Sequence, residues 1–306
     1  TGGDTIQGGI QGQAYDADGT ARGNEFLVNT TTEGGQSLPS VAGLSGGGFV
    51  VTWTDRSRTG GDTSQGGIRG QAYDADGTAR NDEFLVNTTT EGIQVSPSVA
   101  GLSSGGLVAT WTDRSETGGD PSQSAIRGQA YNADGAVRGD EFLLNTTTES
   151  FQHSPSVAGL SDGGFVATWE DRSETGGDTT QGAIRGQVYN ADGTARGDEF
   201  LVNTTTEGNQ ARPSVTGLSD GGFVAMWSDR SETGGDTSDR SVRGQAYDAD
   251  GAARGDEFLV NTTTEGPQYA PSVAGLSDGG FVATWEDMQT GATGADAIGL
   301  EIRAQL

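Results

Sequence analysis

Apolar residues along this chain recur in short runs that are separated by turns rich in Gly and Asp. In the segment 155–212, such runs occupy 155–160, 165–169, 184–189 and 199–203. The turns after the first and third runs combine Gly with Asp or Asn, which accept the positive φ of tight hairpin turns. We therefore predict four antiparallel β-strands in this segment, which argues against a parallel β-helix.

The same pattern returns every 58 residues. A strict period indicates one repeated structural unit. The thirteen residues from Arg196 to Gly208 recur unchanged from Arg254 to Gly266, so the copies offer little of the asymmetry that a unique site needs. The period is marked by a Trp in the second run and a Tyr in the third: Trp53, Trp111, Trp169, Trp227 and Trp285, and Tyr15, Tyr73, Tyr131, Tyr189 and Tyr247.

One unit of this size has too little apolar surface to form a core alone, so the copies should pack on one another. In the second run, Phe165 and Ala167 face one side and Val166 and Thr168 the other, so neither face is strongly polar. The first run carries small residues at 158–159, as expected where inner strands crowd around an axis. These features predict an all-β fold, a five-bladed β-propeller of four-stranded antiparallel blades.

We expect residues 1–306 to form a single propeller domain. The repeat units are approximately 39–96, 97–154, 155–212 and 213–270, and the fifth blade combines 271–306 with 1–38, so that N- and C-terminal strands close the ring. A sixth copy of the third run lies at 302–305. Either this copy displaces the N-terminal one in the closing blade, or the chain was cut from a longer array.

Charge and composition narrow the classes of partner. The chain has 43 acidic and 17 basic residues and a formal charge of -26, so nucleic acid is not an expected partner. No apolar run approaches the roughly 20 residues that cross a bilayer, so membrane insertion is not expected. Cys is absent, which excludes disulfides and thiolate metal sites.

The repeat also carries a resemblance to a known family. Its consensus VNTTTEG-x-Q, PSVAGLSDGGFVATW and IRGQAYDADGTARGDEF resembles repeats of very large secreted bacterial adhesins of the calcium-dependent, RTX-associated kind, over nearly the whole chain. The predicted architecture is also similar to five-bladed tachylectin-like sugar-binding propellers. These resemblances imply an extracellular or cell-surface protein that binds glycans, and they transfer no catalytic residue.

The long loops between the second and third runs are the candidate ligand-binding segments, since scaffolds tend to present function on long loops. Their side chains would hydrogen-bond sugar hydroxyls or hold a cation. The alternative is that they only pair with neighbours and close the loop. The candidates are Asp113, Arg114, Glu116 and Asp120, with Asp171, Arg172, Glu174 and Asp178, and Asp229, Arg230, Glu232 and Asp236.

Asp-x-Asp-Gly tips between the third and fourth runs resemble half of a calcium loop. The downstream bidentate Glu is missing, and a plain Asp-Gly turn is the alternative. The candidate calcium ligands are Asp16, Asp18, Asp74, Asp76, Asp134, Asp192, Asp248 and Asp250. No organic cofactor is expected.

Catalytic chemistry has little support in the sequence. The only His is His153, and Cys and Lys are both absent. Paired carboxylates would be needed to cleave a glycoside, and near-identical blades repeat one residue instead of gathering unlike ones.

The sequence therefore predicts a non-enzymatic, multivalent, lectin-like binding module for glycans or cell-surface and matrix components. Its chain would be a monomeric disc or part of a larger secreted protein. The first alternative is a non-catalytic structural spacer of a large adhesin or matrix protein, and the last is an enzyme of the glycosidase type.

Overall fold

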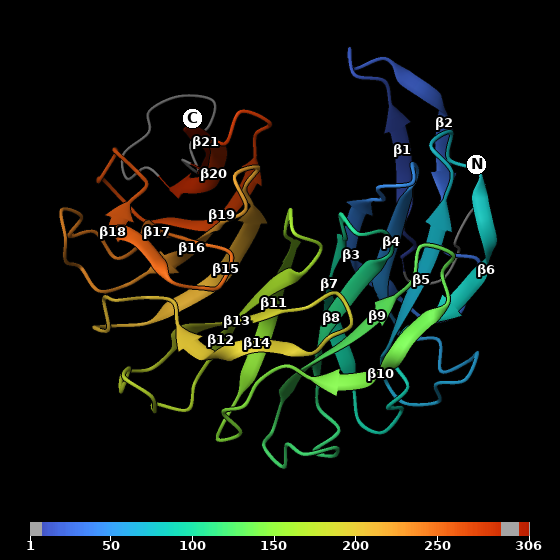
Figure 1. The fold of residues 1–306 in the computed structure, drawn as a ribbon, viewed down its shortest axis with the longest axis horizontal. Coiled ribbons are helices and arrows are strands. Elements are labelled where there is room, and N and C mark those ends of the chain that lie inside the picture. The colour runs from blue at the N-terminus through green and yellow to red at the C-terminus, as the bar shows by residue number, and fades with distance from the viewer. Residues whose placement is uncertain (1–7, 289–299, 306) are drawn as a thin grey trace. The chain divides into compact units, whose positions relative to one another are not determined.

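A computed structural model describes residues 8–288 and 300–305 of the chain. Every regular element in these ranges is a β-strand, and neighbouring strands of each sheet are antiparallel (Figure 1). The predicted all-β fold of antiparallel sheets is therefore confirmed. No helix of the described residues is long and apolar enough to span a membrane. The chain divides into two compact units, residues 1–144 with 191–193, and residues 145–190 with 194–306.

The first unit contains a hairpin and two four-stranded sheets, each with its strands in sequence order. The hairpin is β1 (Gln11–Tyr15) and β2 (Ala21–Leu27). The first sheet is β3 (Gln36–Gly43), β4 (Phe49–Asp55), β5 (Gly67–Tyr73) and β6 (Ala79–Leu85), and the second is β7 (Gln94–Gly101), β8 (Leu107–Asp113), β9 (Ala125–Tyr131) and β10 (Val137–Leu143).

The second unit contains two four-stranded sheets and one three-stranded sheet. They are β11 (Gln152–Gly159), β12 (Phe165–Asp171), β13 (Ala183–Tyr189) and β14 (Ala195–Leu201); β15 (Gln210–Gly217), β16 (Phe223–Asp229), β17 (Ser241–Tyr247) and β18 (Ala253–Leu259); and β19 (Gln268–Gly275), β20 (Phe281–Met288) and β21 (Leu300–Gln305). The fourth strand of a repeat starts at Ala195, earlier than the run at 199–203 suggested, because this part of the strand is polar.

Apolar side chains fill the space between consecutive sheets within each unit. Trp227 of β16 is fully buried in a cluster with Val166 and Ile184 of the preceding sheet, and Trp111 packs in the same way on Val50 and Ile68. Burying a large aromatic between two sheets stabilises both, because neither sheet covers the ring alone. The packing of the repeats on one another is thus confirmed within each unit.

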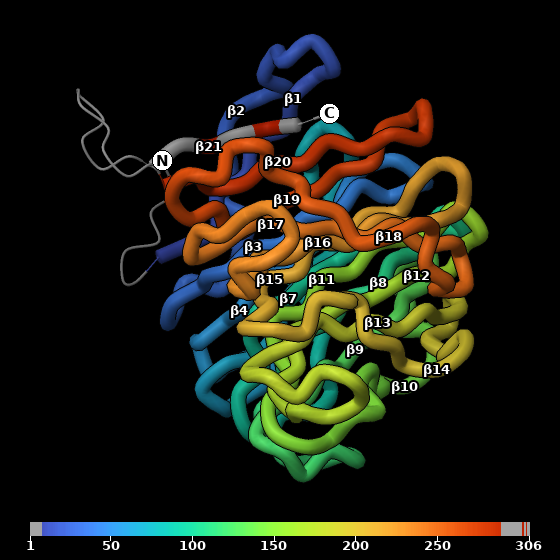
Figure 2. Tube along the Cα trace, turned by 90° about the vertical axis from the view of Figure 1, so that its left-hand side faces the viewer, coloured from blue at the N-terminus to red at the C-terminus, as the bar shows by residue number. Residues whose placement is uncertain are grey.

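The first strands of neighbouring sheets lie side by side within a unit, β3 beside β7 and β15 between β11 and β19 (Figures 1 and 2). Small residues permit this approach. A Cβ added to Gly101 would overlap the carbonyl oxygen of Gly43, and one added to Gly217 would overlap that of Gly159. The small residues expected at the inner strands are therefore a packing requirement.

The strands at the two chain ends belong to different units, so their combination into one blade stays a prediction. The last sheet consists of β19, β20 and β21, so the C-terminal copy of the third run pairs with β20, with Thr284 opposite Ala304. The N-terminal copy is β1, which pairs with β2 in a two-stranded sheet of the first unit. Residues 1–7 and 289–299 of the expected fifth blade lie outside the described residues.

Candidate functional site: a polar pocket where the repeats differ

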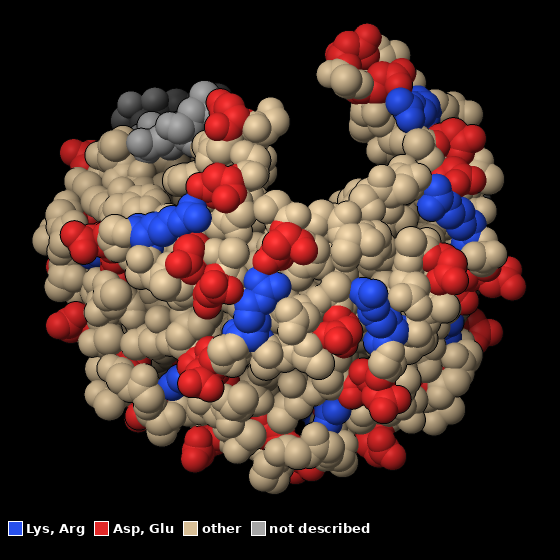
Figure 3. Space-filling view, viewed as in Figure 1, with Lys and Arg blue, Asp and Glu red and all other residues tan. Residues whose placement is uncertain are grey.

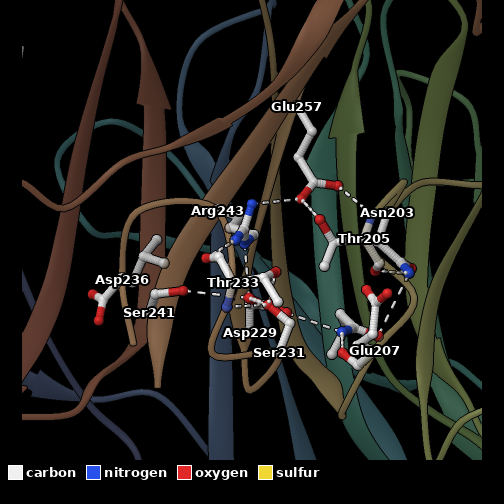
Figure 4. Close-up of polar contacts among 12 residues, drawn as sticks. Asn203, Thr205, Glu207, Asp229, Ser231, Thr233, Asp236, Ser241, Arg243 and Glu257 are labelled. Atoms are coloured by element: carbon white, nitrogen blue, oxygen red, sulfur yellow. Dashed lines mark hydrogen bonds and ion pairs between the residues drawn. The ribbon is translucent and has the colours of Figure 1, made fainter. Parts of the chain in front are cut away.

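A buried ion-pair network occurs in the repeats near the long loop between the second and third strands, for example between β16 and β17. Arg243 on β17 donates from Nε to Oδ2 of Asp229 at 2.7 Å and from Nη1 to Oε1 of Glu257 at 3.0 Å (Figure 4). Its Nη2 donates to the Thr233 carbonyl. The side chain of Arg243 is 6% exposed, so the guanidinium is held within the fold and ties the loop to the sheet.

The same network joins consecutive repeats. Oε2 of Glu257 accepts hydrogen bonds from the backbone N–H of Thr204 and Thr205, and Oε1 accepts from the Thr205 hydroxyl at 2.6 Å (Figure 4). Glu83, Glu141 and Glu199 make the corresponding contacts in their repeats. The Thr-rich connectors therefore serve as attachment points between sheets.

The carboxylates predicted to bind a ligand have internal partners. Asp113, Asp171 and Asp229 are 1–2% exposed and accept from Arg127, Arg185 and Arg243 at 2.6–2.7 Å. Asp120, Asp178 and Asp236 are also buried; each accepts from a backbone N–H two residues later, at 2.8–2.9 Å. Each of the six carboxylates therefore has a partner within the protein. This agrees with the alternative that the loop residues pair with their neighbours and close the loop.

The remaining predicted loop residues lie at the surface. Glu116, Glu174 and Glu232 are exposed and have a positive φ of 54–55°. Arg114, Arg172 and Arg230 are exposed as well. Of these six residues, Arg172 and Arg230 take part in the pocket described below.

The Asp residues predicted to bind calcium form their own turns. Oδ1 of Asp18 accepts from the Thr20 N–H at 2.9 Å, and Asp76 does the same with Thr78. These backbone hydrogen bonds hold the pKa of both carboxyls below its usual value. Asp16 and Asp74 pair with arginines, and Asp134 and Asp248 accept hydrogen bonds from backbone N–H groups. Asp250 lies 3.8 Å from Arg196, and Asp192 lies in the turn that follows β13.

The described residues include no group of three or more His, Cys, Asp or Glu side chains placed to hold a metal ion. Calcium binding stays a prediction. On the face turned to the viewer in Figure 3, basic side chains lie among acidic ones, in agreement with the surface pairs of Arg with Asp at the turns.

A bulge in the first strand of each repeat creates a recurrent contact. Leu38, Ser96, Ser154, Arg212 and Ala270 occupy it, all with φ of 52–56°. The bulged N–H donates to a side-chain oxygen of the preceding sheet, from Ser96 to Thr54 and from Ala270 to Ser228. This contact anchors neighbouring sheets at the edge where the long loops emerge.

At one such contact the residues differ from those of the other repeats. The N–H of Arg212 donates to Oε1 of Glu170 at 2.7 Å, so a carboxylate replaces the usual hydroxyl. Oε2 of Glu170 lies 3.5 Å from Nδ1 of His153, its partner across β11 and β12. Glu170 is 5% exposed, so its charge is held inside by a backbone amide and a histidine.

This contact borders a polar pocket of about 350 Å³ within the second unit. We call it the arginine pocket, because four of its lining residues are arginines and one is acidic. It is lined by Glu170, Arg172, Asn209, Ala211, Arg212, Ser228, Arg230 and Arg240.

Tyr269 lies beside the arginine pocket. Its ring centroid is 5.6 Å from Cζ of Arg212 and 5.3 Å from Cζ of Arg240, distances at which a guanidinium interacts with an aromatic ring. The phenol also hydrogen-bonds the carboxylate of Glu286, which raises the pKa of Tyr269. Tyr269 and Glu286 pair across β19 and β20 as His153 and Glu170 do across β11 and β12.

The sequence reasoning missed this cluster, although a signal was present. Comparing the repeats column by column, Glu170 corresponds to Thr54, Thr112, Ser228 and Glu286. Arg212 and Arg240 also depart from their columns: Arg212 replaces the Leu38, Ser96, Ser154 and Ala270 of the other copies, and Arg240 replaces Gly66, Ser124 and Gly182. Where one repeat has a different residue type from the others at an equivalent position, that position has a different role in that repeat.

A larger hollow of about 540 Å³ lies in the first unit, between the β1–β2 hairpin and the sheet that begins with β3. Its lining is mostly apolar, with Phe26, Val28, Val41 and Phe49 among it, and includes no carboxylate, His or Arg side chain of the described residues. It therefore lacks the groups that acid–base chemistry needs.

Comparison with known proteins gives no match to a family model and none to a curated protein. Among solved structures, the chain resembles the α-L-arabinofuranosidase Arb93A of Fusarium graminearum bound to an iminosugar inhibitor, with a TM-score of 0.57 and 11% identity, covering 92% of this chain and 80% of that one. A complex of the GH93 α-L-arabinofuranosidase of Fusarium graminearum with arabinobiose gives a TM-score of 0.57 at 10% identity and the same coverage. An α-L-arabinofuranosidase from Lactobacillus brevis is 12% identical, with a TM-score of 0.49 and coverage of 88% and 90%.

These comparisons correct the functional prediction. A non-enzymatic binding module, lectin-like or a spacer, is contradicted, because the Fusarium graminearum structures that share the fold are those of a glycoside hydrolase. At this level of identity the likeness establishes the fold alone, which is that of the β-propeller glycoside hydrolases.

Proposed function

We propose that the chain is a glycosidase-type enzyme whose reactive centre is the arginine pocket. The observation that carries the proposal is the convergence of unlike residues, Glu170, His153, Arg212 and Tyr269, at one place in an otherwise repetitive chain. This is the asymmetry that hydrolysis needs. The fold shared with glycoside hydrolases supports the same proposal.

The cluster contains the chemical groups for this reaction. Most glycosidases use two carboxyl groups on either side of the scissile bond, and some use a tyrosine as the nucleophile. Here Glu170 lines the arginine pocket, and Tyr269 with its hydrogen-bonded Glu286 lies next to it. We propose Glu170 as one acid–base group and the Tyr269–Glu286 pair as the other reacting element.

The test is hydrolysis of a glycan panel that includes arabinose-containing polysaccharides and aryl glycosides. Glu170→Gln and Glu286→Gln should each lower kcat by at least about 100-fold, the usual scale of a lost acid–base group. Glu174→Gln, an exposed change in the same repeat, is the matched control and should retain activity. Absence of hydrolysis by the unaltered chain, or full activity in both variants, would overturn the proposal.

We also propose the finer architecture, five blades closed into a ring. The supporting observation is that every pair of neighbouring sheets within a unit repeats one contact through its first strands. Secretion, a glycan partner and calcium dependence remain part of this proposal. The adhesin-like repeat pattern supports secretion, and the arabinobiose complex of the similar enzyme supports a glycan.

A further inference from the structure

The arginine pocket concentrates positive charge in a strongly acidic protein. Four arginine residues line about 350 Å³ together with one acidic residue, Glu170, whereas the whole chain carries a formal charge of -26. Glu170 already accepts the Arg212 N–H and lies beside His153. Its charge is therefore engaged locally, and the guanidinium groups dominate the field in the pocket.

These arginines differ from most others in the chain in having few acidic partners. Across residues 8–288 and 300–305, no carboxylate oxygen lies within 4.0 Å of a guanidinium nitrogen of Arg172, Arg212 or Arg230. Arg240 has only the exposed Asp239, at 3.5 Å. By contrast, eight arginines are paired with a carboxylate: Arg22, Arg69, Arg80, Arg127, Arg185, Arg196, Arg243 and Arg254.

Two of the arginines contact one aromatic ring and line the same pocket. Arg212 and Arg240 have Cζ 5.6 Å and 5.3 Å from the Tyr269 ring centroid, so two like charges share one small region. Nε of Arg240 is buried and makes no hydrogen bond among the described residues, and its nearest carboxylate oxygen, Oδ2 of the exposed Asp239, lies 3.5 Å away. Both features cost free energy, and an anion between the two groups would relieve both.

The geometry points to an anionic sugar as the ligand of the arginine pocket. Guanidinium groups match planar carboxylates and tetrahedral oxyanions through paired N–H donors. The volume suits a monosaccharide unit. The inference rests on the proposed function for its site and adds the substrate class, a glycan unit that bears a carboxylate or a sulfate ester.

Binding is measured separately from hydrolysis, by isothermal titration calorimetry with the unaltered chain at low salt. Methyl glucuronide and glucose 6-sulfate are the two anionic probes, and methyl glucoside and arabinose are the neutral ones. At least one anion should bind at least about tenfold more tightly than either neutral sugar, as expected for charge-assisted hydrogen bonds. The relative affinity of the two anions shows whether the pocket prefers a carboxylate or a sulfate ester. Added NaCl should weaken the binding of the preferred anion, because salt screens the charges.

The repeats themselves supply the substitutions. Arg212→Ser and Arg240→Ser introduce the residues found at Ser96 and Ser124, and Ser96 has the same positive φ as Arg212, so the fold should tolerate the changes. Each should weaken anion binding at least about tenfold. Arg114→Ser, the counterpart of Arg172 in the first unit, is the matched control and should leave binding unchanged.

Equal affinity for anionic and neutral sugars, no binding of either anion, or an equal loss in Arg114→Ser would overturn the inference. The outcome is separable from that of the proposed function. Anion binding without hydrolysis of any glycan would sustain the inference and refute the enzyme. Hydrolysis of neutral glycosides without a preference for anions would support the enzyme and refute the inference.

Discussion

The backbone N–H of Arg212 donates to Oε1 of Glu170 at 2.7 Å, across two neighbouring sheets of the second unit. Elsewhere the same bulged amide donates to a hydroxyl, that of Thr54 or Ser228. A glutamate at this position keeps the anchor and adds a second oxygen, which lies near His153. One substitution thus places a buried carboxylate in a structural contact of the repeat.

Glu170→Thr should separate anchoring from chemistry. Thr occupies this position at Thr54 and Thr112, so the hydroxyl can accept the Arg212 amide and the fold should be kept. Glycan hydrolysis should fall by at least about 100-fold, since the acid–base group is lost. Circular dichroism melting and initial rates measure the two effects.

Glu170→Val is the companion of that variant. It removes the acceptor entirely and leaves a partly buried N–H unpaired, which should lower the free energy of unfolding by about 1–3 kcal/mol. If Glu170→Val and Glu170→Thr melted at the same temperature, the anchoring role of this position would be refuted.

Arg243→Met should be strongly destabilising. The substitution leaves Asp229 and Glu257 buried without their shared cation, and removing one partner of a buried pair typically costs about 3–5 kcal/mol. Urea unfolding followed by tryptophan fluorescence measures the change. Arg196→Met removes a more exposed pair with Asp162 and should cost about 0–1 kcal/mol. Comparable losses in the two variants would contradict a structural role for the buried network.

Gly101→Ala should destabilise the first unit, because the new Cβ would overlap the carbonyl oxygen of Gly43. The expected cost is about 1–3 kcal/mol, the scale of overpacking. Gly43 has nothing within 4 Å of its own added Cβ in the described structure. If the sheets close into a ring, the first strand of another sheet lies against Gly43, and we expect Gly43→Ala to destabilise the protein as well. A normal melting temperature for Gly43→Ala would refute closure.

Alkaline pH should unfold the protein through its repeated tyrosines. Burial raises the pKa of Tyr73 to about 12, and it also raises the pKa of Tyr131, Tyr189 and Tyr247. A raised pKa means that the folded state keeps a proton which the unfolded state loses first, so this stability is complete below pH 10 and falls as pH rises toward 12 and beyond.

Denaturant midpoints between pH 8 and 12 test this dependence, with tyrosinate absorbance as the second readout. Tyr73→Phe should reduce the slope of stability against pH above pH 10, because the phenol that ionises on unfolding is gone. An unchanged slope would contradict the assignment.

Asp76→Ala should lower the melting temperature slightly, with or without calcium, because the carboxylate accepts the Thr78 N–H and shapes its own turn. The comparison is made in millimolar calcium and in chelator. A destabilisation that appears only with calcium would instead establish a metal site at this turn, since a ligand that binds the native state raises its stability.

Much of the fold is encoded locally. The turns at 161–164 and 190–193, the alternation along β12 and the 58-residue period predicted antiparallel strands and sheets that pack on one another. The sequence also predicted the packing role of the small inner residues, because it follows from residue type at a repeated position.

The candidate site could not be read in the same way. Asp229 is a surface ligand if its side chain is exposed and the partner of Arg243 if it is buried. The polar sequence of the loop does not specify that burial. His153, Glu170, Arg212 and Tyr269 belong to three different sheets, and only packing brings them together. Local hydrogen bonding and periodicity determine strands from sequence alone, whereas the encounter of side chains far apart in the chain is decided by how the sheets stack.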